Sequence, residues 1–70
     1  MKKICATVSG RVVQCLVNEG HQVKAGEEVV KIESMKMEIP VESEINGQVT
    51  KVLVQEGDEV QEGQVLVELG

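Results

Sequence analysis

The fold of this chain is decided by the stretch Val29–Val41, which reads VVKIESMKMEIPV. Two β-prone runs, residues 28–33 and 37–42, are joined by only three residues, and this spacing predicts a β-hairpin with Lys36 near its turn. In the second run Met37, Ile39 and Val41 alternate with polar residues and Pro40, so one face can meet a core while the other meets water. We therefore expect Lys36 at the tip of an amphipathic hairpin.

The proline in this hairpin constrains where the second run lies in a sheet. Pro40 has no backbone N–H and cannot donate a hydrogen bond to a neighbouring strand. We expect residues 37–42 to form an edge strand, with Pro40 on its wet face.

An internal repeat extends from the hairpin through the rest of the chain. Shifting the sequence by 37 positions gives nine identities over residues 10–33, among them the glycine pairs Gly10/Gly47, Gly20/Gly57 and Gly26/Gly63. The last two pairs follow strand-like runs and are typical of turns. The repeat predicts two halves, about 1–36 and 37–70, related by an approximate twofold axis. Such an axis places Lys36 at the opposite pole from the chain termini.

Each half contains four strand-like runs, which predicts an all-β fold. The expected strands are Lys2–Val8, Gly10–Val17, Gln22–Val23, Glu28–Glu33, Met37–Glu42, Gln48–Val54, Glu59–Val60 and Val65–Leu69.

Size and composition place the function on the surface. Seventy residues form one domain, residues 1–70, and a chain this short buries only about 60% of its surface on folding. Its apolar residues are mainly 14 valines, with no Phe, Tyr or Trp, a mixture enriched in strand formers. A typical substrate pocket of roughly 300–1,000 Å³ would remove most of such a core. We therefore expect the function to lie on the surface of the domain rather than in an internal pocket.

Charge and hydropathy exclude two classes of partner. The formal net charge is −5, with acidic residues scattered along the chain, so we expect no nucleic-acid binding. No run approaches the roughly 18 apolar residues of a membrane span, and residues 1–4 lead into a strand without a signal-peptide pattern. We expect a cytoplasmic protein that does not bind membranes and is monomeric by itself.

Three residues suggest chemistry that the rest of the sequence does not support. Cys5, Cys15 and His21 could in principle bind zinc, but there is no Cys-x-x-Cys pair and no evident fourth ligand. Two cysteines are too few to indicate a disulfide framework. Nucleophilic catalysis by either thiol would need a nearby base, and His21 is more simply interpreted as a solvated turn residue.

The lysine of the hairpin is the candidate functional residue. Lys36 stands between two unbranched neutral side chains, Met35 and Met37, at the junction of the two repeats. An amine there is accessible to acylation, which would remove its charge. Glu33 and Glu38 beside it are either recognition groups for a modifying enzyme or solvated charges at strand ends.

The repeat together with Glu33-Ser34-Met35-Lys36-Met37 resembles the biotinyl domain of biotin carboxyl carrier proteins, within the biotin/lipoyl attachment family. The resemblance implies a flattened β-barrel of two four-stranded antiparallel sheets with the modified lysine between the fourth and fifth strands. It implies that a biotin protein ligase joins biotin to Lys36, with Met35 and Met37 as flanking recognition residues. Biotin carboxylase and carboxyltransferase are the implied partners, and the implied role is a non-catalytic carrier that takes carboxyl groups from the first to the second. Only four residues separate Val17 from Gln22, which leaves no room for the extra "thumb" loop of some carriers.

Two alternatives to a biotin carrier remain open. A lipoyl carrier has a similar fold but usually presents Asp-Lys-Ala at the hairpin, where this chain has Met35 and Met37. An unmodified β module that only mediates interactions would usually lack the Met-Lys-Met sequence altogether.

Overall fold

The computed structural model describes residues 2–70, and these form eight β-strands. Between residues 2 and 70 there is no helix, and hence none that could cross a membrane. The strands are β1 (Lys2–Cys5), β2 (Gly10–Cys15), β3 (Gln22–Val23), β4 (Glu28–Ser34), β5 (Met37–Glu42), β6 (Gly47–Val52), β7 (Glu59–Val60) and β8 (Val65–Leu69).

The strands form two four-stranded antiparallel sheets, as predicted. One sheet has the order β1-β8-β6-β3 and the other β5-β4-β2-β7. In the repeat β1 to β4 correspond to β5 to β8, in that order. Exchanging every strand for its counterpart converts one sheet order into the other, so the sequence repeat corresponds to a twofold relation between the sheets. The predicted pseudo-twofold fold is confirmed.

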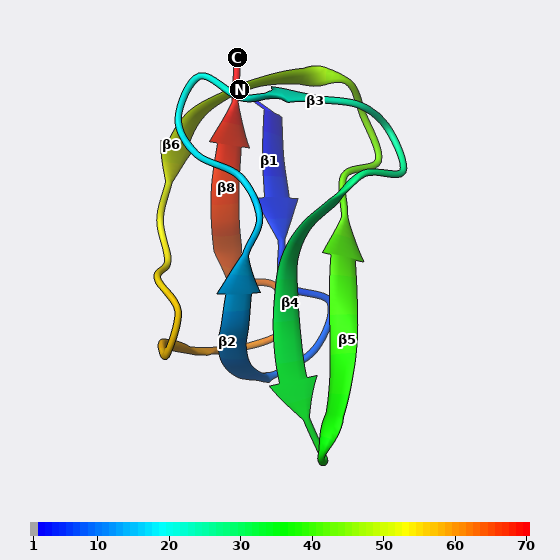
Figure 1. Ribbon diagram of the computed structural model, residues 1–70, viewed down its shortest axis with the longest axis vertical. Coiled ribbons are helices and arrows are strands. Elements are labelled where there is room, and N and C mark those ends of the chain that lie inside the picture. The colour runs from blue at the N-terminus through cyan, green and yellow to red at the C-terminus, as the bar shows by residue number, and fades with distance from the viewer. Residues whose placement is uncertain (1) are drawn as a thin grey trace.

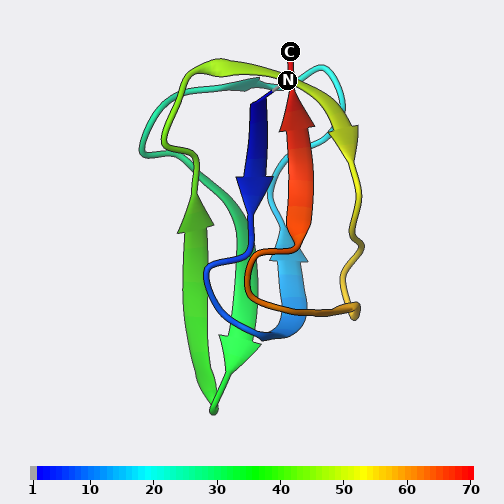
Figure 2. The same cartoon turned by 180° about the vertical axis from the view of Figure 1, so that it is seen from behind.

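The chain termini and the β4–β5 turn lie at opposite ends of the molecule. The described chain measures 31 Å along its longest axis, and the N- and C-terminal ends lie together at one end of it. The turn between β4 and β5 forms the opposite tip in both views (Figure 1, Figure 2). The prediction that Lys36 and the termini occupy opposite poles is confirmed.

The core between the sheets is built almost entirely from aliphatic side chains. Fully burying each such side chain contributes roughly 1.5–3 kcal/mol. The buried set is Ile4, Ala6, Val12, Val17, Val23, Val29, Val30, Ile32, Val41, Val49, Val54, Val60, Leu66, Val67 and Leu69.

The two central strands β2 and β6 each contain a bulge, and both are shorter than expected. Val12 and Val17 are both buried although they are five residues apart, which a regular two-residue period does not allow. The register of β2 against β4 shifts between Val12 and Gln14, and β6 shifts against β8 at the equivalent place. A bulge of this kind inserts one residue and bends the strand. The expected ends of these strands, Val17 and Val54, were wrong. The strands end at Cys15 and Val52, and beyond them only the N–H groups of Leu16 and Leu53 still donate to the neighbouring strand segments, at Val29 and Leu66.

The first strand is also shorter than expected. β1 ends at Cys5 rather than Val8, because the next residue leaves the ladder. The N–H of Ala6 donates to the carbonyl of Gln64, and the carbonyl of Ala6 accepts from the N–H of Gly63. The chain thus pairs with the turn before β8 instead of continuing along β8.

The remaining expectations about edges and turns are confirmed. β5 lies at the edge of its sheet, with Pro40 exposed on it. Gly20 and Gly57 have φ of 90° and 97°, values that glycine adopts without steric cost. Residues 16–21 alone connect β2 to β3, so no thumb is present between them.

Candidate functional site

The turn that carries Lys36 has an unusual backbone. Ser34 pairs with Met37 at the end of the β4–β5 ladder, which leaves Met35 and Lys36 as a two-residue turn. Both have positive φ, 54° and 63°, as in a type I′ turn. That turn prefers Asn-Gly, and a residue with a Cβ pays about 1–2 kcal/mol in this conformation. Strain of this kind is concentrated at functional sites.

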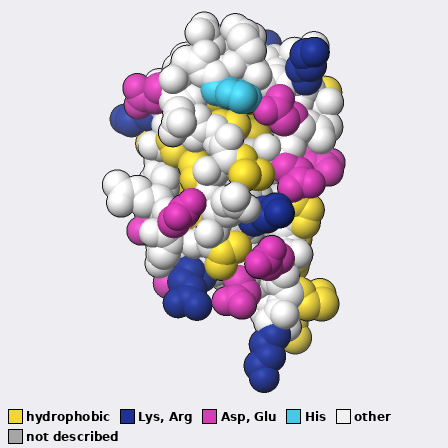
Figure 3. Space-filling model, viewed as in Figure 1, with side chains coloured by type: hydrophobic (Ala, Val, Ile, Leu, Met, Phe, Trp, Pro, Cys, Tyr) yellow, Lys and Arg dark blue, Asp and Glu magenta, His cyan; other side chains and the backbone are white. Residues whose placement is uncertain are grey.

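The side chains of the turn point into solvent. Met35 is 91% exposed and Met37 is 61% exposed, and Lys36 is also exposed. Figure 3 shows the molecule ending in a basic side chain with apolar atoms close to it. The expectation that Met37 faces the core with Val41 was wrong, because the hairpin extends past the end of the opposite sheet.

A row of charged residues crosses the sheet just behind the turn. Glu38 of β5 pairs with Glu33 of β4, Glu33 with Arg11 of β2, and Arg11 with Glu59 of β7. We call these four residues the charged row. An Nη2–Oε1 contact of 3.4 Å joins Arg11 to Glu33, with side chains 57% and 43% exposed. An ion pair this exposed contributes about 0–1 kcal/mol. Glu33 is therefore only weakly paired beside the turn, and it remains accessible.

The histidine of the chain lies far from the turn, in the upper part of Figure 3. His21 Nε2 is 2.8 Å from Glu27 Oε2, and the N–H of Lys24 donates to Glu27 Oε1 at 3.1 Å. The hydrogen bond with His21 and then that from Lys24 lower the pKa of Glu27 below its ordinary value of 4.5. This pair was not predicted from the sequence, although a spacing of six residues across one tight turn could have indicated it.

The residues considered for metal or thiol chemistry are not brought together. Among residues 2–70 no three His, Cys, Asp or Glu side chains are grouped so as to hold a metal ion. Cys5 is exposed and Cys15 half-buried, and both are free thiols. The Sγ of Cys15 contacts the carbonyl of Val17 at 3.4 Å, while its backbone N–H is 3.4 Å from Glu56.

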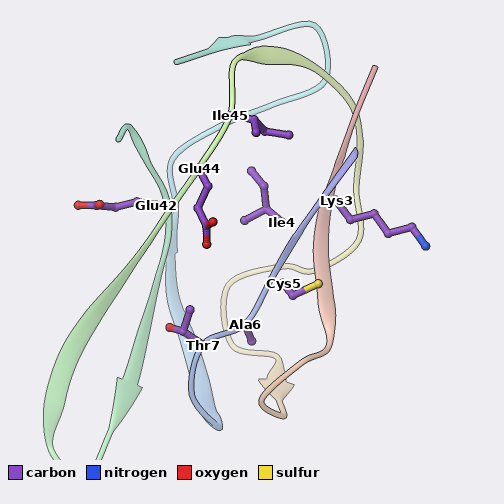
Figure 4. A pocket seen from close by; sticks show the side chains of 8 residues that line it. All are labelled: Lys3, Ile4, Cys5, Ala6, Thr7, Glu42, Glu44 and Ile45. Atoms are coloured by element: carbon purple, nitrogen blue, oxygen red, sulfur yellow. The ribbon is translucent and has the colours of Figure 1, made fainter. Parts of the chain in front are cut away.

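A hollow of about 370 Å³ lies on one side of the sandwich, between β1 and the segment after β5 (Figure 4). Ile4 and Glu44 point toward one another inside it, whereas Lys3 points away. The thiol of Cys5 lies on the same side of β1 as Lys3, away from Ile4 and Glu44. No histidine lines the hollow, so Cys5 has no imidazole partner there.

A sandwich of two twofold-related sheets with a lysine exposed on the β4–β5 hairpin defines the class of biotinyl/lipoyl attachment domains. The comparison with protein families agrees: the chain belongs to the biotin/lipoyl family, described as "Biotin-requiring enzyme", whose model matches residues 3–69. The predicted family is confirmed, and biotin is the cofactor that this family requires.

Among curated proteins the chain is similar to Biotinylated protein TB7.3 of Mycobacterium tuberculosis and of Mycobacterium bovis. Each is 53% identical over 36 residues, which cover 51% of this chain and 51% of the relative. The match thus spans about half the length of these relatives.

Solved structures show the same fold inside much larger enzymes. The urea carboxylase of Kluyveromyces lactis superposes with a TM-score of 0.91 and 30% identity, over 99% of this chain and 6% of that chain. A single-chain, multi-domain long-chain acyl-CoA carboxylase gives a TM-score of 0.87 and 30% identity, over 94% of this chain and 6% of that chain. The chain therefore resembles a small part of these much larger carboxylases.

Proposed function

We propose that this chain is a biotin carboxyl carrier. Lys36 is joined to biotin by a biotin protein ligase, and the loaded domain carries carboxyl groups from a biotin carboxylase to a carboxyltransferase. The observation that carries the proposal is the exposed Met-Lys-Met turn, at the pole opposite the termini, in a member of a biotin-requiring family.

The attachment step needs an accessible amine. With the carboxyl group of biotin activated by the ligase and ATP as a mixed anhydride with AMP, neutral Lys36 Nζ would attack its carbonyl carbon. The C–N amide bond would form, the C–O bond to AMP would break, the amine proton would pass to solvent, and Nζ would lose its charge. The two-residue turn holds the lysine in one backbone conformation before the ligase binds, so less ordering is required on binding. We assign ligase recognition to Met35 and Met37, whose exposed side chains flank the amine, and to Glu33 of the charged row.

The carrier contributes proximity rather than catalysis. Bound biotin supplies a ureido nitrogen that accepts a carboxyl group derived from bicarbonate. The rigid β body presents the lysine at its tip, and a long arm on that tip lets two separate active sites be visited in turn. The transfer becomes nearly intramolecular, which raises the effective concentration to the millimolar range. In this proposal residues 1–70 act as one cytoplasmic domain, monomeric by itself.

The proposal is tested by co-expressing the chain with a biotin protein ligase and measuring intact mass. We expect the mass to rise by one biotinyl group, and Lys36→Arg to remain unmodified because arginine keeps the charge but offers no acylable amine. Lys31→Arg, on the same hairpin, is the matched control and should load normally. Biotin on the Lys36→Arg protein would defeat the assignment.

The same sample distinguishes the lipoyl alternative. A carrier of biotin binds streptavidin and gives no signal with an antibody against lipoate. The reverse result would assign the chain to the lipoyl carriers.

A further inference from the structure

A shallow hollow of about 450 Å³ lies directly beside the lysine. Its walls are Ser9–Arg11, at the start of β2, and Ser34–Lys36 of the hairpin, with Glu33 and Glu59 between them. It is open to solvent on one side. Because Lys36 itself lines the hollow, a group carried on its side chain is held next to it.

A glycine keeps the two walls close together. A Cβ placed on Gly10 would meet the backbone carbonyl oxygen of Glu33 and would lie 2.9 Å from Cγ2 of Ile32. No larger residue fits at this position without displacing the backbone. The close approach of β2 to β4 fixes Arg11 next to Glu33 at the floor of the hollow.

Three residues of the charged row give this floor an ordered hydrogen-bonding pattern. Glu59, Arg11 and Glu33 lie on three neighbouring strands, about 4.8 Å apart from strand to strand. The two carboxylates only accept hydrogen bonds and the guanidinium between them only donates. The pattern is therefore acceptor, donor, acceptor. At the rim Ser9 Oγ accepts from the N–H of Glu62 at 3.0 Å, which leaves its hydroxyl hydrogen to donate.

We propose that this hollow is an intramolecular docking site for the ureido ring of the biotin carried by Lys36. A ureido group presents two N–H donors on either side of one carbonyl acceptor, which is the complement of the row Glu59, Arg11, Glu33. This inference rests on the proposed function. The dithiolane ring of lipoate has no N–H or carbonyl group, so the hollow would not hold it in this way.

The energetics permit docking without trapping the ring. The Arg11–Glu33 contact is 3.4 Å long and about half exposed, so replacing it with hydrogen bonds to a ureido group costs little. A short tether gives an effective concentration in the millimolar range, so an intrinsic dissociation constant of about 1 mM is enough to dock the ring half of the time. The ring is then held close to the domain between visits to partner enzymes and is released easily.

The experiment compares amide chemical shifts of the isotope-labelled domain before and after loading with biotin, with loading verified by intact mass. We expect shifts at Met35–Met37 from acylation itself, and further shifts at Ser9–Arg11 and Glu59 from the docked ring. In the loaded Arg11→Gln variant the amide shifts at Ser9–Arg11 and Glu59 should return to their unloaded values, while the shift changes at Met35–Met37 remain. Lys31→Gln removes a cation one residue pair further from the turn on the same sheet, so both sets of shift changes should persist in it.

A kinetic readout complements the shifts. Streptavidin captures only the undocked ring, so loaded Arg11→Gln should be captured about twofold faster than loaded wild type if docking is half populated. Shift changes confined to the hairpin of a loaded domain, or equal capture rates, would overturn the docking site and leave the proposed function standing. A chain that takes up no biotin at Lys36 would overturn both.

Discussion

At the scale of single residues, the turn at Met35 and Lys36 is the feature that local sequence rules do not predict. Left-handed turns of two residues are indicated by Asn-Gly or Asp-Gly, and Met-Lys is not a turn sequence. The runs on either side located the hairpin correctly, but they could not reveal that both turn residues have positive φ. Here the paired ends of β4 and β5 impose a strained conformation on Met35 and Lys36, although neither residue favours it.

Replacing Met35 should therefore stabilise the fold. Asparagine tolerates positive φ, and the exposed methionine has little packing to lose, so Met35→Asn should raise the free energy of unfolding by roughly 1 kcal/mol. Urea unfolding measures this change. The matched control is Met37→Asn, which is also exposed but lies in β5, where asparagine is a poor strand former. If both variants changed stability equally, turn strain would not be the cause.

Glu27 makes stability depend on pH. Its hydrogen bonds with His21 and the Lys24 N–H lower its pKa in the folded protein, so folding favours the ionised carboxylate. This stabilisation is complete above the ordinary pKa of 4.5 and is lost as pH falls through the lower folded value. Glu27→Gln should thus lower the melting temperature at neutral pH and have little effect in strong acid.

Melting temperatures of wild type and Glu27→Gln, compared at neutral pH and in strong acid, test the role of the His21–Glu27 pair. Glu28→Gln, a neighbouring half-buried glutamate for which no partner of this kind is described, serves as the control. An equal effect of Glu27→Gln at both pH values would contradict the assigned role of the carboxylate.

At the scale of strands, alternation and glycine spacing predicted every strand, and the repeat predicted which strands correspond. The bulges in β2 and β6 were missed because a bulge changes the period by only one residue, although Val12 and Val17 at odd spacing carried that signal. The charged row could not be predicted. Arg11, Glu33 and Glu59 are distant in sequence and meet only through the strand register.

The twofold-related glycines at the start of β2 and β6 allow a test of strand packing. Gly10→Ala brings a Cβ against the backbone oxygen of Glu33, and such overpacking should cost roughly 1–3 kcal/mol. Gly47→Ala places the same atom 3.2 Å from Cβ of Leu69, a contact that a small adjustment can relieve, so its cost should be smaller. Denaturant unfolding of the two variants gives the comparison. Equal costs would show that the approach of β2 to β4 is not as tight as described.

At the scale of the whole molecule, the twofold arrangement separates the lysine from the termini by the length of the sandwich. In the proposed function the pole with Lys36 enters a partner's active site, and the other pole is left for joining to a larger chain. The solved carboxylases contain this fold as 6% of their length. The repeat predicted this layout, because a twofold axis relates the junction of the two halves to the chain ends, and a junction away from the axis lies on the opposite side from them.

The central claim is that Lys36 alone among the lysines of this chain carries biotin. The direct test incubates the purified wild-type chain with a biotin protein ligase, ATP and biotin, and then maps the modified peptide by tandem mass spectrometry. The account predicts one biotinyl group on Lys36 and none on the other lysines. Modification at another lysine, or no modification under conditions that load a known carrier, would contradict it.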